Sequence, residues 1–477
     1  MKNKVRWLAG ILAVIFVAAG FPVWTVKAAD EEPFDMTAAP VPKETSEEEE
    51  NTKKAYEMKV ESNELTGWPK GPQTYGEAGI VMDAKSGAIL FAKNIDGKAY
   101  PASITKILTA LVALENGNVE DKITITQECI DFLEYGDAHI GMTPGEEITL
   151  NDALHALLLA SANEVAYAIG ANTGEGYDWF IEQMNIRAKE LGAVNSHFVN
   201  TNGLQDPDHY TTARDMALIS RELFLNHPEF SEISQTKEYR IPATNLVSEE
   251  RVFQQKHQMF YDWCENYDSR VTAGKTGYTE NALNTLVTCA DDGNMKLVCV
   301  VLKTHGRNVY PDTKSLLDYG YDNFQKVEIA GKEKSEDIKS MEGGAYVVLP
   351  PGIDFESLQM ELVPDGDDAS SGTAVYTYEG NPVGSVKIAF SEEYLKKNAP
   401  EVLEKNEDQS KKTAENVVEK VKESIPSWVY LVLKGFGVLI GLVIIWLVIA
   451  FFVRRKRRRE RLRRRKMRRQ RKRRREE

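Results

Sequence analysis

The sequence predicts an α/β (α+β) domain with a helical insert, followed by a small all-β domain and a C-terminal transmembrane helix. Three observations support this prediction. Short apolar runs bounded by turn residues lie on both sides of a long stretch with helical periodicity, residues 101–235. Residues 326–396 alternate between apolar runs and turns rich in Gly, Pro and Asp. Residues 435–453 carry no charge, and 19 residues suffice to span a bilayer as a helix.

The N-terminal 28 residues have the pattern of a secretory signal peptide. A basic start precedes an apolar run over 7–17, and small residues follow at 26–28. An uncleaved segment that stays in the membrane as an anchor is the alternative. The next stretch, 29–69, is rich in Glu with scattered Pro, and we expect an acidic, disordered spacer there.

The two ends of the chain are basic and its body is acidic. The net charge is −13, yet residues 454–477 alone carry +15, and residues 29–453 carry −32. An acidic body argues against nucleic acid as a partner, because a duplex-binding surface should be positive. We expect the basic tail to lie in the cytoplasm, with a membrane-spanning helix over 428–453 and contacts to anionic lipids. The body would then be extracytoplasmic, on a protein that crosses the cell membrane once.

Residues 70–325 form the predicted α/β domain. It opens with a strand–turn–strand signal in which Lys85-Ser86-Gly87 is the turn. Apolar residues at helical spacing follow Pro101, and strands return after residue 270. The expected strands are 78–83, 89–93, 270–275, 283–289 and 296–302, and the expected helices after the first are 150–159, 164–170 and 312–323.

The all-β domain is expected over 326–396 and a charged stalk over 397–427. Its strands are predicted at 345–349, 359–362, 373–378 and 385–390.

Four cysteines in an exported chain raise the question of disulfides. A two-residue loop at Asp292-Gly293 would place Cys289 opposite Lys296, so that Cys289 and Cys299 point to opposite faces of the sheet. A bond between Cys129 and Cys264 stays open, but four buried thiols are favoured.

Three short motifs occur in a fixed order along the chain. They are Ser103-Ile104-Thr105-Lys106, Ser161-Ala162-Asn163 and Lys275-Thr276-Gly277. Each is weak alone, because Ser-x-x-Lys recurs at Ser234–Lys237, where a solvated surface pair is the simpler interpretation. Their order and their expected placement on a helix, a turn and a strand favour a common function.

The first motif is suited to nucleophilic catalysis. On a helix Ser103 and Lys106 share one face. The helix start after Pro101 would favour a developing alkoxide at Ser103. Lys106 can act as the base when its amine is neutral, and burial beside the second cation, Lys275, would lower its pKa.

The other two motifs supply the remaining groups. Ser161 would relay a proton to the leaving amine, and Asn163 would hold either Lys106 or a substrate amide. Gly277 lets a substrate backbone lie along the strand, while Thr276 and Lys275 meet a carboxylate. The backbone N–H groups of Ser103 and Tyr278 would form the oxyanion hole.

These residues resemble the low-molecular-mass penicillin-binding proteins, the serine D-alanyl-D-alanine carboxypeptidases of peptidase family S11. The resemblance covers about residues 70–396 and implies a β-lactamase/transpeptidase-like fold. It includes the first and third motifs, Asn202-Gly203-Leu204, and Thr212-Ala213-Arg214-Asp215. It implies acylation of Ser103 by a peptidoglycan stem pentapeptide, release of the terminal D-alanine, and inhibition by β-lactams. It also implies that Arg307 binds the terminal carboxylate, and that no cofactor is needed.

The sequence departs from the family's pattern in two places, and three alternative functions compete with this interpretation. Position 278 is Tyr where many relatives have His, and the anchor resembles a spanning helix where many relatives have an amphipathic one. A β-lactamase would need a deacylating glutamate, and Glu280 follows the third motif instead of preceding it. A penicillin-binding sensor would need a cytoplasmic domain. No His-Glu-x-x-His indicates a metalloenzyme, and His209 is expected to be structural. Gly437 and Gly441 are weak indicators of a helix dimer.

Overall fold

The computed structural model describes residues 46–366, 369–400, 402, 434, 440, 442–451, 453 and 454. The chain separates into two compact units, 1–55 and 56–477. Several predictions fall outside the described residues: the signal peptide, residues 29–45 of the spacer, most of the stalk, half of the transmembrane helix with Gly437 and Gly441, and the basic tail beyond residue 454. Within the residues that are described, we find no helix whose length and hydrophobicity would let it cross a bilayer.

A five-stranded antiparallel sheet forms the centre of the α/β domain. Its strand order is β2-β1-β9-β8-β7. The N-terminal hairpin therefore joins strands from much later in the chain, because β1 pairs with β9, from Gly76 opposite Thr304 to Asp83 opposite Leu297. Strand β7 lies at one edge and pairs only with β8. The strands are β1 (Gly76–Asp83), β2 (Ile89–Lys93), β7 (Val271–Thr279), β8 (Leu283–Asp291) and β9 (Lys296–Thr304).

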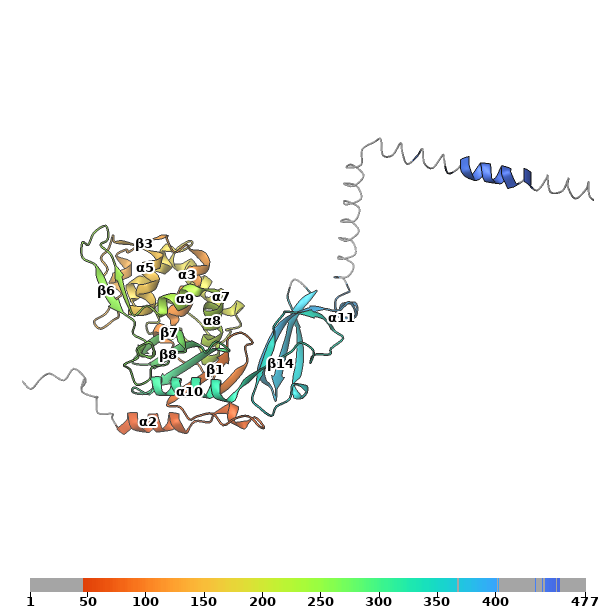
Figure 1. The fold of residues 1–477 in the computed structure, drawn as a ribbon. Helices are drawn as coiled ribbons and strands as arrows, with labels where there is room; N and C mark the ends of the chain where they lie inside the picture. The colour runs from red at the N-terminus through yellow and green to blue at the C-terminus, as the bar shows by residue number, and fades with distance from the viewer. Residues whose placement is uncertain are drawn as a thin grey trace, which may run out of the picture. The chain divides into compact units, whose positions relative to one another are not determined.

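Both faces of this sheet are buried, as the continuous apolar runs of β8 and β9 require. Along β9, Val298 and Val300 belong to the core shared with the helical insert, whereas Cys299 and Val301 belong to the core on the other face. Helix α8 (Ala213–Asn226) covers the first face and α10 (Val309–Asn323) the second (Figure 1).

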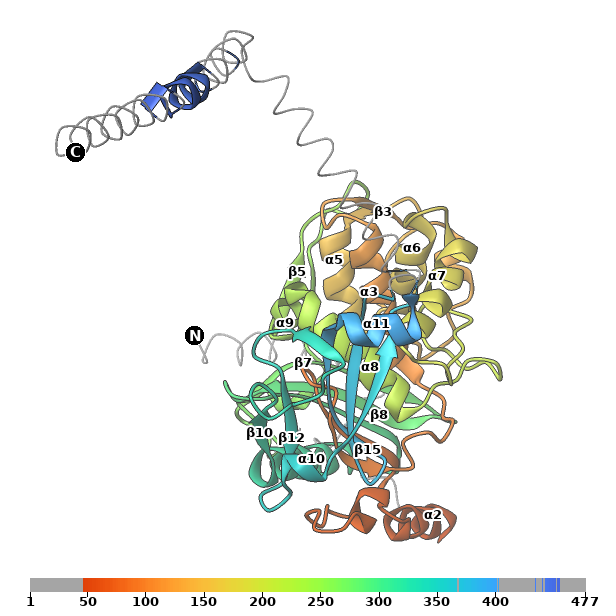
Figure 2. The ribbon, with the colours of Figure 1, turned by 90° about the vertical axis from the view of Figure 1, so that its right-hand side faces the viewer.

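The helical insert separates β2 from β7 (Figure 2). It includes two β-hairpins that the periodicity analysis missed. A π-helix, η3 (Ala156–Ala160), replaces the second half of the helix predicted at 150–159. The helices are η2 (Ala102–Thr105), α3 (Lys106–Asn116), α4 (Glu128–Asp131), α5 (Leu150–His155), α6 (Asn163–Asn172), α7 (Tyr177–Glu190), α9 (Pro228–Ser234) and η4 (Gln258–Phe260). The hairpins are β3 (Lys122–Thr124) with β4 (Glu147–Thr149), and β5 (Glu238–Ile241) with β6 (Arg251–Gln254).

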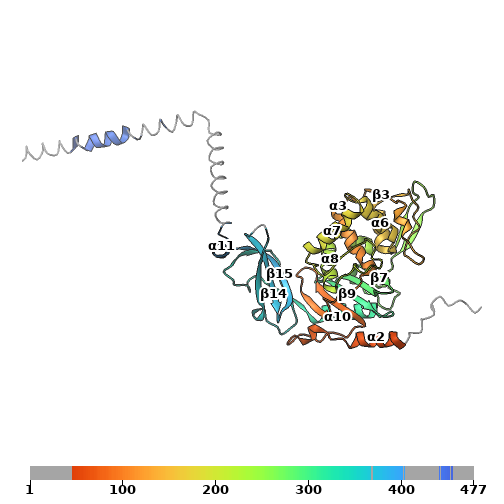
Figure 3. The same cartoon turned by 180° about the vertical axis from the view of Figure 1, so that it is seen from behind.

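The β-rich region that follows contains two sheets (Figure 3). It contacts the hairpin of the first domain, where Tyr346 Oη donates to Asp83 at 3.2 Å and Ser385 N donates to Ser86 O at 2.9 Å. The elements are β10 (Gln325–Glu328), β11 (Ile338–Met341), β12 (Tyr346–Leu349), η5 (Phe355–Ser357), β13 (Gln359–Pro364), β14 (Ser371–Tyr378), β15 (Asn381–Phe390) and α11 (Glu392–Asn398). The four strands predicted here correspond to β12, β13, β14 and β15.

The structure differs from the predicted disordered spacer over its last 24 residues. Residues Ser46–Glu57 form helix α2, and Glu61–Glu64 form the short helix η1. Val60 and Trp68 are buried in the core beside α10. The composition is acidic, but Val60 and Trp68 bury apolar surface in this core, and Trp68 Nε1 also donates to Leu90 O at 3.0 Å.

Two local predictions also need correction. The β8–β9 loop has four residues, because Asp291 pairs with Lys296, so Cys289 faces Val298 and not Lys296. Cys289 and Cys299 still point to opposite faces, and all four cysteines are free. Three of them are buried as predicted, but Cys264 is only partly buried. Ser234 is fully buried at the end of α9, so Ser234 and Lys237 are not a solvated pair.

Candidate active site

Ser103 and Lys106 come together at the start of the first long helix. Ser103 lies in the 3₁₀ turn η2, and the α-helix begins only at Lys106. Lys106 Nζ lies 3.0 Å from Ser103 Oγ. The same amine donates to Asn163 Oδ1 at 2.7 Å and to the carbonyl oxygen of Asn202 at 2.6 Å. The three contacts fix a fully buried lysine against the hydroxyl of Ser103.

The surroundings of Lys106 favour its neutral form. Burial holds the pKa of Lys106 well below its usual value, and the charges of Lys275 and Lys256 lower it further. The carboxylates of Glu164 and Asp137 oppose this shift. A neutral amine within hydrogen-bond distance of a hydroxyl can accept its proton, which makes Ser103 a nucleophile.

The second motif lies in a tight connection between η3 and α6. Ser161 has a left-handed backbone, with φ 63° and ψ 32°. Its Oγ is buried, and no hydrogen-bond partner is found for it among the described residues. Asn163 begins α6, and its N–H donates to the carbonyl oxygen of Ala138 at 2.8 Å. A buried hydroxyl without a partner is available to a substrate or to a proton in transfer.

The third motif lies inside edge strand β7, not at its end. Burial, together with the charge of Lys256, lowers the pKa of Lys275 to about 7. Its Nζ donates to Thr276 O at 2.9 Å. A Cβ on Gly277 would lie 2.3 Å from Thr285 Oγ1 and 3.0 Å from Ser103 N. Only glycine therefore lets β7 approach the nucleophile this closely.

The two N–H groups predicted for the oxyanion hole lie on these neighbouring segments. Ser103 contributes one, and Tyr278 follows Gly277 on β7. The side chain of Tyr278 is 61% exposed. This side chain therefore projects towards solvent and is not part of the core.

Arg307 is less closely tied to the site. It is exposed in the turn between β9 and α10, and in the described part of the chain it forms no hydrogen bond with another predicted site residue. Asn284 Nδ2 donates to Gly306 O at 2.7 Å and so holds this turn against β8. Glu280 is exposed in the turn between β7 and β8.

Several groups that build the site were not predicted in these roles. Asn202 supplies a carbonyl oxygen to Lys106, and a Cβ on Gly203 would lie 1.9 Å from Ala102 O. His209, in contrast, was predicted to be structural. Its Nε2 lies 2.8 Å from Thr105 Oγ1, and burial lowers the pKa of His209 to about 4, so the imidazole is neutral near pH 7. Glu164 is buried directly after the second motif. The adjacent pair Asn202-Gly203 was the one signal in the sequence that could have indicated the contact between the Asn202 carbonyl oxygen and Lys106.

Comparison with known proteins shows the family of the chain. A model of the D-alanyl-D-alanine carboxypeptidase family matches residues 67–306. The D-alanyl-D-alanine carboxypeptidase DacA of Haemophilus influenzae is 29% identical over 66% of this chain and 84% of its own length. DacB2 of Mycobacterium tuberculosis, a protein of the same description, is 31% identical over 53% of this chain and 84% of its own length. The crystal structure of the Streptomyces K15 DD-transpeptidase superposes with a TM-score of 0.50 at 26% identity, covering 53% of this chain and all of that one. The chain belongs to the D-alanyl-D-alanine carboxypeptidase family of serine hydrolases.

Proposed function

We propose that this protein removes the terminal D-alanine from peptidoglycan stem pentapeptides through an acyl-enzyme on Ser103. The observation that carries the proposal is the contact between Ser103 Oγ and the buried amine of Lys106 at 3.0 Å. An amine whose pKa is depressed by burial is the base that a serine nucleophile needs. Family membership supplies the substrate class.

In the first half of the reaction, Lys106 accepts the hydroxyl proton while Ser103 Oγ attacks the carbonyl carbon of the penultimate D-alanine. The backbone N–H groups of Ser103 and Tyr278 stabilise the oxyanion that forms. When the tetrahedral species collapses, the C–N bond breaks and the proton passes through Ser161 to the departing amine. Terminal D-alanine leaves, and the peptide stays esterified to Ser103.

In the second half, water attacks the ester carbonyl and Lys106 accepts a proton from that water. The Ser103 Oγ–C bond breaks, and the hydroxyl recovers its proton. Water therefore supplies the hydroxyl group of the new peptide carboxylate. A β-lactam follows the same first half, because its amide also presents a carbonyl carbon to Ser103.

The edge position of β7 supports a binding mode for the substrate. An edge strand leaves backbone donors and acceptors free on one side, so an extended peptide can add as a sixth strand. Lys275 and Thr276 would then meet the terminal carboxylate, with Arg307 approaching from its exposed turn.

The test uses the chain and its Ser103→Ala variant with a synthetic stem pentapeptide. We expect D-alanine release from the unsubstituted protein only. Equal release from both proteins would contradict the mechanism. The lifetime of the penicillin adduct on Ser103 then separates this function from that of a β-lactamase. A carboxypeptidase keeps the adduct for minutes or longer, whereas turnover within seconds would favour the β-lactamase.

We also propose that the catalytic domain lies outside the cell membrane. The sequence of residues 1–28 and the uncharged run before the basic tail support this location, and the tail would contact anionic lipids from the cytoplasmic side. Proteolysis of intact spheroplasts tests it. Protease added outside should degrade the domain and spare a tag placed after residue 477, and the reverse pattern would contradict the proposal. Ending the chain at residue 427 should release the domain into the medium.

A further inference from the structure

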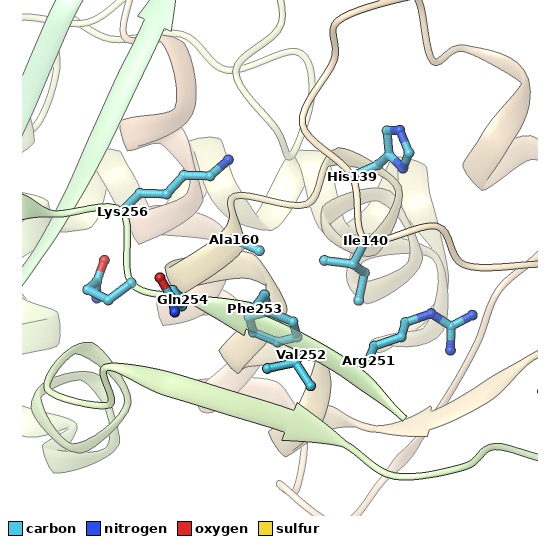
Figure 4. Close-up of a pocket in the computed structure, with 9 residues that line it drawn as sticks. His139, Ile140, Ala160, Arg251, Val252, Phe253, Gln254 and Lys256 are labelled. Atoms are coloured by element: carbon cyan, nitrogen blue, oxygen red, sulfur yellow. The ribbon is translucent and has the colours of Figure 1, made fainter. Parts of the chain in front are cut away.

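A cavity of about 690 Å³ borders the candidate active site (Figure 4). Its walls come from strand β6 with the residues that follow it, from the loop that carries His139 and Ile140, and from Ala160 at the end of η3. Ala160 directly precedes Ser161, so one wall of the cavity continues into the second motif. The proposed reaction does not use this space.

Lys256 connects the cavity to the catalytic groups. It lines the cavity, and its charge lowers the pKa of both Lys106 and Lys275. The geometry agrees with this effect, because Lys256 directly precedes His257, and a Cβ on Gly274, the neighbour of Lys275 on β7, would lie 2.8 Å from His257 Cδ2. Figure 4 shows Lys256 and Arg251 at opposite ends of the segment that borders the cavity, with Val252, Phe253 and Gln254 between them.

The charge of the cavity is positive and is not compensated at Lys256. Within the described part of the chain, none of the nine lining residues is acidic. Arg251 is already paired, because its guanidinium contacts buried Glu146 at 2.7 Å and donates to Gly141 O at 3.0 Å. Among the described residues, none forms a hydrogen bond or an ion pair with Lys256 Nζ. Lys256 is therefore the cation that remains available to a ligand.

The remaining walls suit a short carbon chain. Val252 is 45% exposed, an unusual position for a valine, and Ile140 and Phe253 are partly buried beside it. Covering this apolar surface with methylene groups would be favourable by about 25 cal/mol for each Å² removed from water. The cavity thus combines apolar walls with one available cation.

We propose that this cavity binds the side chain of the residue that precedes D-alanyl-D-alanine in the substrate, and that Lys256 selects side chains ending in a carboxylate. The inference rests on the proposed function. The reacting carbonyl belongs to the penultimate residue and lies at Ser103. One residue of extended chain spans roughly 3.5 Å, so the side chain of the preceding residue is within reach of a cavity whose wall adjoins Ser161.

The experiment compares three peptides of the form acyl-X-D-Ala-D-Ala. Residue X is 2-aminoadipate with a carboxylate, homoglutamine with a neutral amide of the same length, or lysine with an amine. D-alanine release gives kcat/KM for each peptide with the unsubstituted chain, Lys256→Gln and Lys256→Glu. Lys237→Gln, which removes an exposed lysine that does not line the cavity, is the matched control. The readout is the ratio between peptides, because any change in the pKa of Lys106 or Lys275 affects all three peptides and cancels.

The unsubstituted chain and Lys237→Gln should prefer the carboxylate peptide over the amide peptide by about fivefold, the effect expected of a partly exposed ion pair. Lys256→Gln should abolish this preference, and Lys256→Glu should make the lysine peptide the best of the three. A preference that persists in Lys256→Gln, or ratios near one in the unsubstituted chain, would overturn the inference while D-alanine release continues. Absence of release from every peptide, with every variant, would overturn the proposed function and the inference with it.

Discussion

The amine of Lys106 determines the pH at which this site can work. In water a lysine titrates near 10.5, where a neutral amine would be scarce at physiological pH. Lys106 is buried beside Asn163, Asn202 and Ser103, and this burial holds the pKa of Lys106 well below that value. Because Ser103 can be acylated only when Lys106 is neutral, the acylation rate should rise with pH through the lowered pKa.

Asn163→Asp tests this relation. The substitution puts a carboxylate where Lys106 Nζ now contacts an amide oxygen at 2.7 Å. An opposite charge at this distance favours the protonated amine, so the pKa of Lys106 should rise by roughly 1–3 units. In the pH profile of the rate at which a β-lactam acylates Ser103, the rise on the acidic side should therefore move to higher pH by a similar amount. An unchanged pH profile, or an unsubstituted chain whose rise lies near pH 10.5, would show that Lys106 is not the base.

Glu164 is a second buried group whose role can be tested. Its Oε1 accepts a hydrogen bond from Ile140 N at 2.7 Å, and burial raises its pKa. Glu164→Gln keeps an acceptor at this position, whereas Glu164→Ala leaves the Ile140 N–H buried without a partner. We expect Glu164→Ala to lower the free energy of unfolding by about 1–3 kcal/mol, and Glu164→Gln to lower it by less. Urea unfolding measures both. Equal losses would show that the charge of Glu164, not its hydrogen bond, holds the loop.

At the scale of single residues, the sequence predicted the contact between Ser103 and Lys106 but not the groups that surround it. Ser103 and Lys106 lie three residues apart, so one turn of helix brings them together whatever the rest of the fold does. The carbonyl oxygen of Asn202 reaches Lys106 across 96 residues, and any residue type could have supplied it. Lys256 and Glu164 were missed because burial and proximity in space give a lone lysine or glutamate no sequence pattern.

Among the elements, the contact between β7 and η2 is the one on which the site depends most. Gly277 lies where a methyl group would collide with Thr285 Oγ1 and crowd the N–H of Ser103. Thr285 Oγ1 in turn donates to Pro101 O at 2.9 Å, which ties η2 to the sheet. A side chain at position 277 must therefore push the edge strand away from the nucleophile.

We expect Gly277→Ala to reduce the rate of Ser103 acylation by at least about tenfold, because a displacement of 1 Å at a reacting centre is costly. Gly343→Ala is the matched control, since a Cβ there would meet no atom within 4 Å. Acylation by a fluorescent penicillin measures both variants. Thermal unfolding of the same samples shows whether Gly277→Ala remains folded. A folded Gly277→Ala that acylates as fast as the control would contradict this account of β7.

Most strands were predictable because they are apolar runs bounded by turn residues, and β1 and β2 lie close to where the pattern placed them. The errors have physical causes. The β8–β9 register depends on the length of the loop, where Asp292 Oδ1 caps a four-residue turn by accepting from Met295 N at 2.7 Å. Helix η1 and the segment up to Trp68 are ordered by burial against residues far along the chain, which composition cannot reveal.

At the scale of the whole molecule, the fold brings together segments that are far apart in sequence. The N-terminal hairpin β1–β2 completes a sheet whose other strands come after the helical insert, and β2 also packs against η1. The insert therefore contributes the first two motifs, and the late strands contribute the third. A chain cut within the insert would separate Ser103 from the strand that carries the proposed oxyanion donor, Tyr278.

Because long-range contacts bury two histidines, the stability of the whole fold should depend on pH. Burial lowers the pKa of His209 to about 4 and that of His257 to about 3. Both contribute stability that is fully present above the unfolded pKa of about 6.5 and is lost as pH falls towards 4, because the unfolded chain then binds protons that the folded chain excludes. Asp312, whose pKa is raised to about 6, acts in the opposite direction between pH 6 and 4 and offsets part of this loss.

Urea unfolding at pH 7.5 and pH 5 measures how the free energy of unfolding changes with pH. Between pH 7.5 and pH 5, each histidine should lower the free energy of unfolding by about 2 kcal/mol, whereas Asp312 should raise it by about 1 kcal/mol. His209→Gln should reduce the difference in stability between the two pH values by about 2 kcal/mol. Gly343→Ala, which adds a methyl group where no atom lies within 4 Å and changes no titratable group, should leave that difference as it is. If His209→Gln unfolds with the same pH dependence as the unsubstituted chain, His209 is not held neutral by the fold, and its contact with Thr105 needs another explanation.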